Sequence, residues 1–169
     1  RAWETAEEVD YIAHVSAARR FIEHKLADTR AINQVQPNGR VQLAFEGQPH
    51  RLAFVAVSQG YTEVGGLYQY ELRLDNGSDG AQALYVTQAL YRPNGPVAET
   101  AQKRLLIDRV ENVEMRYFGT TAGGWAPTWS NTSKLPQLVS IKIEFPKGDP
   151  RRWPEQVVRI MAAQTLPYR

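Results

Sequence analysis

The feature that most constrains this sequence is a stretch free of Gly and Pro over residues 2–29, after which the residue pattern changes completely. Acidic side chains crowd its start and basic ones its end, an order that complements the dipole of an α-helix. At about 100° per residue, one stripe of core-facing width collects Tyr11, Ile12, Val15, Ala18, Ile22 and Leu26. We therefore predict one long amphipathic helix within residues 1–32.

A second stripe lies on the side of this helix that would otherwise face water. It combines small and aromatic residues: Trp3, Ala6, Ala13, Ala17 and Phe21. Small side chains at spacings of four let another helix approach closely. Alanine is also a good helix former on any exposed face. The stripe is therefore either a partner-binding surface or a plain solvent-exposed face.

The chain after residue 35 shows the alternation of β-strands. Pro37, Asn38 and Gly39 end the helical region, and the following segments alternate at period two. Strands are predicted over residues 41–45, 52–57, 67–74, 83–91, 104–110, 113–118 and 138–145. We expect the first two to form a hairpin, and the next two to pair across a turn at Asp75, Asn76 and Gly77.

A last apolar segment, residues 157–161, is either a closing strand or a short helix, and its β-branched content favours a strand. The expected fold class is thus α+β, with a single domain over residues 1–169. We predict that the long N-terminal helix packs on a β-rich head, residues 40–169, of about seven to nine antiparallel strands in two sheets or a partly open barrel.

Composition excludes several kinds of function. The chain of 169 residues has no Cys, which excludes thiol nucleophiles, cysteine zinc sites and iron–sulfur clusters. Its formal net charge of +2, with no long basic run, gives no electrostatic reason to expect a nucleic-acid partner. The longest apolar run, residues 52–57, has six residues, whereas a membrane span needs about twenty.

Residues that carry chemistry are few. The three histidines, His14, His24 and His50, are scattered, and the first two lie about 15 Å apart on the predicted helix. Residues 75–80 lack the ligand spacing of a calcium loop and are better explained as a hairpin turn. Several carboxylates could meet in space as an acid–base pair: Glu71, Asp75, Asp108, Glu111 and Glu114. We predict no catalytic, cofactor-binding or metal-ligating residue.

Two tryptophans, Trp125 and Trp129, stand out because they occur in a polar, Gly-containing loop. Large aromatic side chains there can cover the open end of a sheet. They can equally dock a partner, since aromatic residues are enriched at the centres of interfaces. The sequence leaves both interpretations open.

Several short segments support a resemblance by their order along the chain. They are ARRFIE (18–23), LAFV (52–55), VGGLY (64–68), LRL (72–74), residues 110–118 with Tyr117 and Phe118, then Trp125, Trp129 and LPQLV (135–139). In this order they resemble the minor pseudopilin J family of bacterial type II secretion systems. The resemblance implies a pilin-like fold and a structural subunit without a cofactor.

The resemblance also implies a precursor with a short leader, cut by prepilin peptidase and methylated, whose helix begins with an apolar membrane half that this chain lacks. The domain would then lie in the periplasm, on a protein with a single span of the inner membrane. It would sit at the pseudopilus tip with minor pseudopilins of the I and K types, prime the filament and support protein export. Other pseudopilins and exported proteins are further expected partners. A periplasmic β-rich hydrolase or ligand-binding domain is the alternative.

Overall fold

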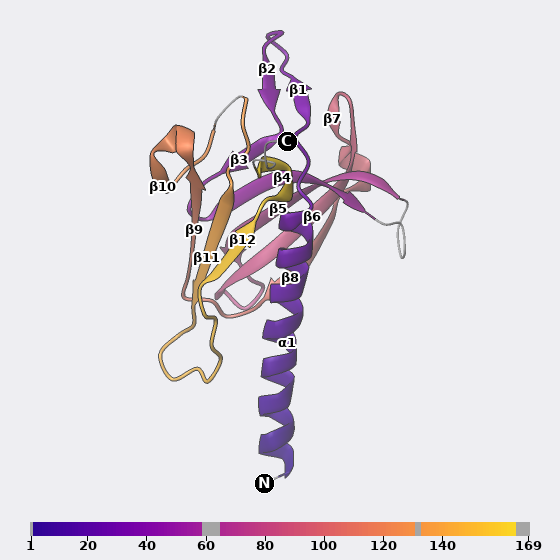
Figure 1. Cartoon of the computed structure of the whole chain (residues 1–169). Helices are drawn as coiled ribbons and strands as arrows, with labels where there is room; N and C mark the ends of the chain where they lie inside the picture. The colour runs from indigo at the N-terminus through magenta and orange to yellow at the C-terminus, as the bar shows by residue number, and fades with distance from the viewer. Residues whose placement is uncertain (1, 59–64, 131–132, 165–169) are drawn as a thin grey trace.

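The chain folds into one long helix and three antiparallel sheets (Figure 1). The computed structural model describes residues 2–58, 65–130 and 133–164, and for residues 2–13 and Thr121 the backbone alone. Helix α1 (Ala2–Ala27) comes first, and its second half packs against strands of both large sheets. No helix within these described ranges is long and apolar enough to cross a membrane.

The buried face of α1 confirms the predicted stripe where side chains are described. Four residues of that stripe face the core and are almost inaccessible: Val15, Ala18, Ile22 and Leu26. Tyr11 and Ile12 lie outside the described side chains. The helix ends at Ala27, earlier than predicted, because the backbone N–H of Arg30 donates to the carbonyl of Val55 instead of continuing the helix, at 2.8 Å.

The larger sheet contains the second predicted hairpin and part of the first. Its strands are β3 (Phe45–Gly47), β4 (Arg51–Ser58), β5 (Gly66–Asn76), β6 (Gln82–Arg92) and β7 (Gly95–Pro96), with β8 (Gln102–Ile107) also paired to β6. The pair β5–β6 confirms the second hairpin. The first is confirmed only in part, because β3 pairs with β4 from Phe45 on, while residues 41–43 of the predicted strand form β2 and pair with β1. The second turn closes slightly later than predicted, where the N–H of Gly77 donates to Ala81 at 2.6 Å.

The second large sheet has the order β10 (Gly124–Ala126), β9 (Asn112–Gly119), β11 (Leu138–Glu144) and β12 (Gln156–Arg159). Strand β12 confirms the closing strand, and a single 3-10 turn, η3 (Met161–Ala163), follows it. A small two-stranded sheet pairs β1 (Asn33–Val35) with β2 (Val41–Leu43). Two further 3-10 turns are η1 (Ala98–Thr100) and η2 (Thr120–Ala122).

The expected strand number is not confirmed, because the described residues form twelve strands. Five of them, β1, β2, β3, β7 and β10, have only two or three residues. Strands this short show too few repeats for a period of two to be detected. The α+β class and the antiparallel pairing agree with the prediction, while the head consists of separate sheets.

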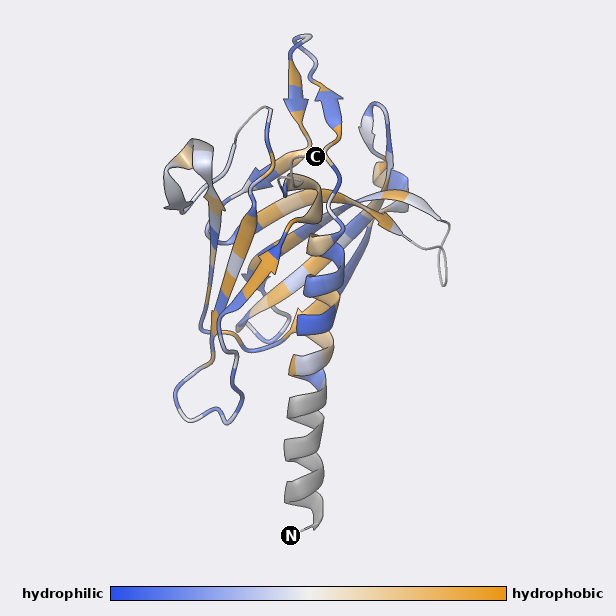
Figure 2. Cartoon of the chain, viewed as in Figure 1, coloured by the Kyte–Doolittle hydropathy of each residue, from blue (hydrophilic) through white to orange (hydrophobic). Residues whose placement is uncertain are grey.

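The core lies between the inner faces of the two large sheets and α1. Along β4, Leu52, Phe54 and Ala56 enter it, and along β11 Val139, Ile141 and Ile143 do the same. The neighbours of these residues point to the opposite face of each sheet, as the period of two requires. On that face Val55 is buried in a second small cluster with Ala44 and Tyr91, and Ser140 is buried as well. Figure 2 shows the resulting alternation of apolar and polar positions along the strands. The second half of the helix thus shares one core with both large sheets.

Candidate functional site

One flank of α1 is attached to the four-stranded sheet through Arg19. Its guanidinium donates to the carbonyl of Pro154 at 2.6 Å and lies 5.1 Å from the ring centroid of Trp153. In return, Nε2 of Gln156 donates to the carbonyl of Arg19 at 2.8 Å. Trp153 and Gln156 are buried, so this flank is fixed by both hydrogen bonding and packing.

The other flank of α1 meets the six-stranded sheet through Phe21 and Lys25. The Phe21 ring packs edge-on against Tyr70, with centroids 6.2 Å apart, and the Arg104 guanidinium lies 4.8 Å from it. Nζ of Lys25 lies 5.2 Å from the Tyr70 ring. Phe21, predicted in the outward stripe, is therefore half-buried against its own chain.

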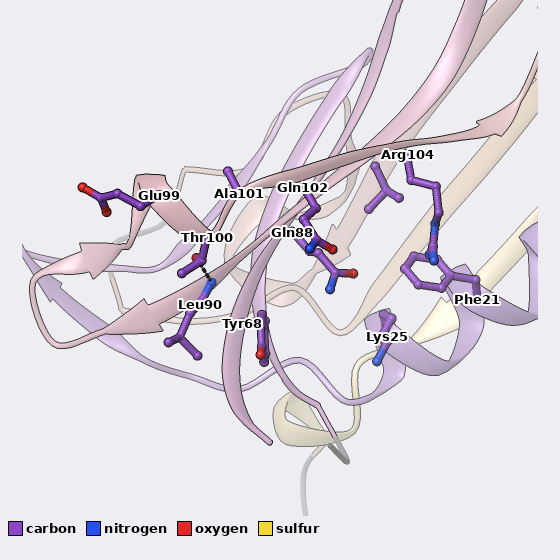
Figure 3. Close-up of a pocket in the computed structure, with 11 residues that line it drawn as sticks. Phe21, Lys25, Tyr68, Gln88, Leu90, Glu99, Thr100, Ala101, Gln102 and Arg104 are labelled. Atoms are coloured by element: carbon purple, nitrogen blue, oxygen red, sulfur yellow. Dashed lines mark hydrogen bonds between the residues drawn. The ribbon is translucent and has the colours of Figure 1, made fainter. Parts of the chain in front are cut away.

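An open groove of about 680 Å³ lies between this flank, β6, β8 and η1. Phe21, Lys25 and Arg104 stand at one end, and Figure 3 shows Arg104 reaching toward the Phe21 ring. Glu99 lies at the opposite end, and Gln88 lines the middle. The groove is mostly polar and basic at the helix end, so it suits a charged chain segment better than an apolar ligand.

Ala17 lies on the outward face of α1 and is exposed, as the predicted stripe requires. It is about 140° around the helix from buried Ile22. The other members of the stripe, Trp3, Ala6 and Ala13, lie outside the described side chains.

The two tryptophans have different environments. Trp129 is only 4% exposed, donates its Nε1–H to the carbonyl of Lys134 at 2.9 Å and packs over Gly119, so it covers the end of β9. Because its ring is buried, the structure does not support Trp129 as a contact for a partner. Trp125, on β10, is 38% exposed and packs edge-on against Phe118, with centroids 5.4 Å apart.

The candidate acidic residues are spread over separate ion pairs. Glu71 contacts Arg51 at 2.8 Å and Arg73 at 3.1 Å. Asp75 contacts Lys103 at 3.5 Å and Asp108 contacts Arg151 at 3.0 Å. Glu111 and Glu114 are exposed, as are all three histidines. Among the described residues, no three His, Asp or Glu side chains come together in a way that could hold a metal ion.

Sequence reasoning missed Arg151, a buried residue whose side chain makes six hydrogen-bond contacts. It links the loop before β12 to the Asp108–Arg109 turn, and it also stacks on Phe145, 4.2 Å from the ring centroid. These hydrogen bonds to the turn span more than forty positions in sequence, so no local pattern marks them. The neighbouring Asp149 has its pKa held below the usual 3.8, chiefly by the hydrogen bond from the Arg151 side chain.

Comparison with known proteins gives one consistent result. The family model described as type II secretion system (T2SS), protein J, matches residues 4–154. A curated protein of Xanthomonas campestris pathovar campestris, named type II secretion system protein J, is 26% identical over 153 residues. The matched part covers 85% of this chain and 70% of that relative.

Proposed function

Because this chain belongs to the type II secretion system protein J family and is a minor pseudopilin of type II secretion, we propose that it acts at the tip of the pseudopilus. There it binds other minor pseudopilins, primes the filament and supports protein export across the outer membrane. The observation that carries this proposal is the outward face of α1. It presents Ala17 to solvent while the opposite face is buried in the head.

We propose that the partners are minor pseudopilins of the I and K types, which contact this outward face helix to helix. Small side chains allow the close axial approach that such packing needs. The contact surface would comprise Trp3, Ala6, Ala13 and Ala17, with half-buried Phe21 at its end. Trp125, exposed on β10, is a second contact point from the head.

Proteins of this family are inner-membrane-anchored components with a periplasmic part, and we propose the same location here, with one N-terminal span. Helix and head are proposed to act as a single domain, because α1 shares one hydrophobic core with both large sheets. The role is structural rather than enzymatic: two of the candidate acidic residues, Glu71 and Asp108, are held in ion pairs with arginine.

The test is the substitution Ala17→Glu, examined in co-expressed periplasmic domains of the three pseudopilins by size-exclusion chromatography. A charged, longer side chain on a close helix–helix contact should dissociate the complex. Since Glu is a good helix former, the isolated chain should keep its fold. Ser16→Glu is the matched control, because it adds the same charge about 100° around the helix. An Ala17→Glu complex that elutes like the wild type would remove the outward face from the proposal.

A further inference from the structure

Strand β8 is an edge strand that no described strand covers. It pairs with β6 on one side, from Gln102 opposite Gln88 to Ile107 opposite Leu84. On its other side, the backbone of residues 102–107 makes no hydrogen bond to any further strand of the described chain. Such an edge offers main-chain donors and acceptors to an incoming strand.

The pairing pattern identifies which groups are free. Consecutive residues of an antiparallel strand direct their N–H and C=O groups to opposite sides. In β6, Leu90 bonds on the β8 side, through the hydroxyl of Thr100 at 2.8 Å and the N–H of Val97 at 2.8 Å. The even-numbered residues Val86 and Gln88 of β6 therefore direct their N–H and C=O groups toward β8, where Arg104 and Gln102 lie opposite them.

It follows that the N–H and C=O groups of Lys103, and the N–H of Leu105, point away from β6, toward the free side. Beyond Leu105 the register shifts, so that Ile107 rather than Leu106 lies opposite Leu84. The two faces beside this edge differ in chemistry. On the inner face, Arg104 lies opposite buried Val86 and enters the groove, where Lys25 stands on the adjacent helix (Figure 3). On the outer face, the side chain of Leu105 is 50% exposed.

Arg104 and Lys25 both carry positive charge that no described carboxylate neutralises. Both cations instead lie over aromatic rings: Arg104 over Phe21, and Lys25 over Phe21 and Tyr70. A cation over a ring keeps its other side available for an anion. Glu99, the acidic residue of the groove, lies at its far end (Figure 3).

We propose that β8 binds an extended segment of another protein, which adds as a further strand and places acidic side chains beside Arg104. Its alternate residues lie beside Leu105 and are apolar. A second copy of this chain does not fit the edge, because pairing β8 with β8 would bring Lys103 and Arg104 against the same two cations. This goes beyond the proposed function and does not depend on which pseudopilins contact α1.

The test uses the isotopically labelled chain of 169 residues and an acetylated eight-residue peptide of alternating Glu and Val. We expect the largest amide shifts at Lys103 and Leu105, and binding that weakens as salt is raised. The matching peptide of alternating Lys and Val should not bind. A Glu and Val peptide N-methylated on the alternate amides that face β8 keeps its charge but loses its hydrogen-bond donors, and it should not bind either.

Arg104→Gln should weaken binding about fivefold, the effect of losing one partly exposed charge pair. Arg159→Gln, the same change on exposed β12, should leave binding unchanged. Equal binding of the acidic and basic peptides would overturn the proposal, as would equal binding of the N-methylated peptide. Self-association through β8 would overturn it in favour of a second copy. None of these results bears on assembly with pseudopilins through α1, so the two proposals fail separately.

Discussion

Replacing Arg151 with alanine tests how the head holds the helix. The Arg151 side chain is 3% exposed, and all five of its N–H groups donate to nearby oxygens. Two reach the carboxylate of Asp149, at 3.0 and 2.8 Å. The others reach the backbone and side-chain oxygens of Asp108, at 2.8 and 3.0 Å, and the carbonyl of Arg109, at 2.8 Å. A buried guanidinium stabilises the fold strongly when each of its N–H groups has an acceptor, and this stabilisation depends on all of these acceptors staying in place.

The expected cost follows from what the truncation leaves behind. The Asp149 carboxylate, 11% exposed, would lose its cation, and the carbonyls of Asp108 and Arg109 would lose their charged donor. Removing one partner of a buried ion pair lowers the free energy of unfolding by about 3–5 kcal/mol. In a chain of this length, each kcal/mol lowers Tm by about 2–4 °C. We therefore expect Arg151→Ala to lower Tm by about 6–20 °C.

The position of Arg151 connects this loss to the helix. It lies in the loop between β11 and β12, just before Trp153 and Gln156, the residues that hold Arg19 of α1. A relaxed loop would shift both contacts together. Fluorescence of Trp153 cannot be isolated among four tryptophans, so amide hydrogen exchange of α1 is the better probe of this coupling.

Thermal unfolding followed by circular dichroism is the assay. Arg152→Ala is the control, because the adjacent side chain is exposed and donates only to backbone carbonyls, at 3.1 to 3.3 Å. That variant should stay within about 0.5 kcal/mol of the wild type. If Arg151→Ala is no less stable than Arg152→Ala, the assignment of Arg151 as a buried structural cation is refuted.

Two further predictions concern the same head. Hydrogen bonding to Arg151 lowers the pKa of Asp149 below 3.8, so this carboxylate stabilises the fold above pH 3.8 and loses that contribution as the pH falls through its lower pKa in the folded state. When the free energy of unfolding is measured against pH, it should fall more steeply below pH 3.8 in the wild type than in Asp149→Asn. Equal slopes would contradict this prediction. Gly47→Ala would drive a methyl group into the buried Tyr117 ring, whose hydroxyl is held by the carbonyl of Gln48 at 2.7 Å, and should lower stability in urea unfolding by about 1–3 kcal/mol. A Gly47→Ala chain as stable as the wild type would show that this ring can move.

The sequence pattern predicted those features that depend on residues close together in the chain, such as the buried face of the helix. The period of the helix identified Val15, Ala18, Ile22 and Leu26 as its buried face, since one turn of helix decides which side chains share a side. The same projection placed Ala17 outward. The hairpins followed from turn chemistry, because Gly-containing turns fix which strands become neighbours.

Features that depend on distant partners were not predictable from local patterns. Strands β8 and β9 follow each other closely in sequence, yet β8 joins β6 while β9 joins β11 in the other sheet. Trp125 and Trp129 occur in one polar loop, but only Trp129 finds a glycine, Gly119, that leaves room for its ring. Such differences arise from packing across the fold, which a single-sequence pattern does not contain.

The two flanks of α1 together explain why one face of the helix is available to a neighbour. Gln156 and Pro154 hold Arg19 from the β12 side, while Arg104 packs on Phe21 from the β8 side. Since these contacts lie on opposite flanks of the core-facing stripe, rotating the helix in either direction would break one set. The head therefore fixes the rotation of α1, and with it the direction in which Ala17 points. In the helix-to-helix assembly proposed above, the head would then determine which helix face meets the neighbouring pseudopilin. A change that loosens either flank should thus weaken assembly even when Ala17 and its neighbours are intact.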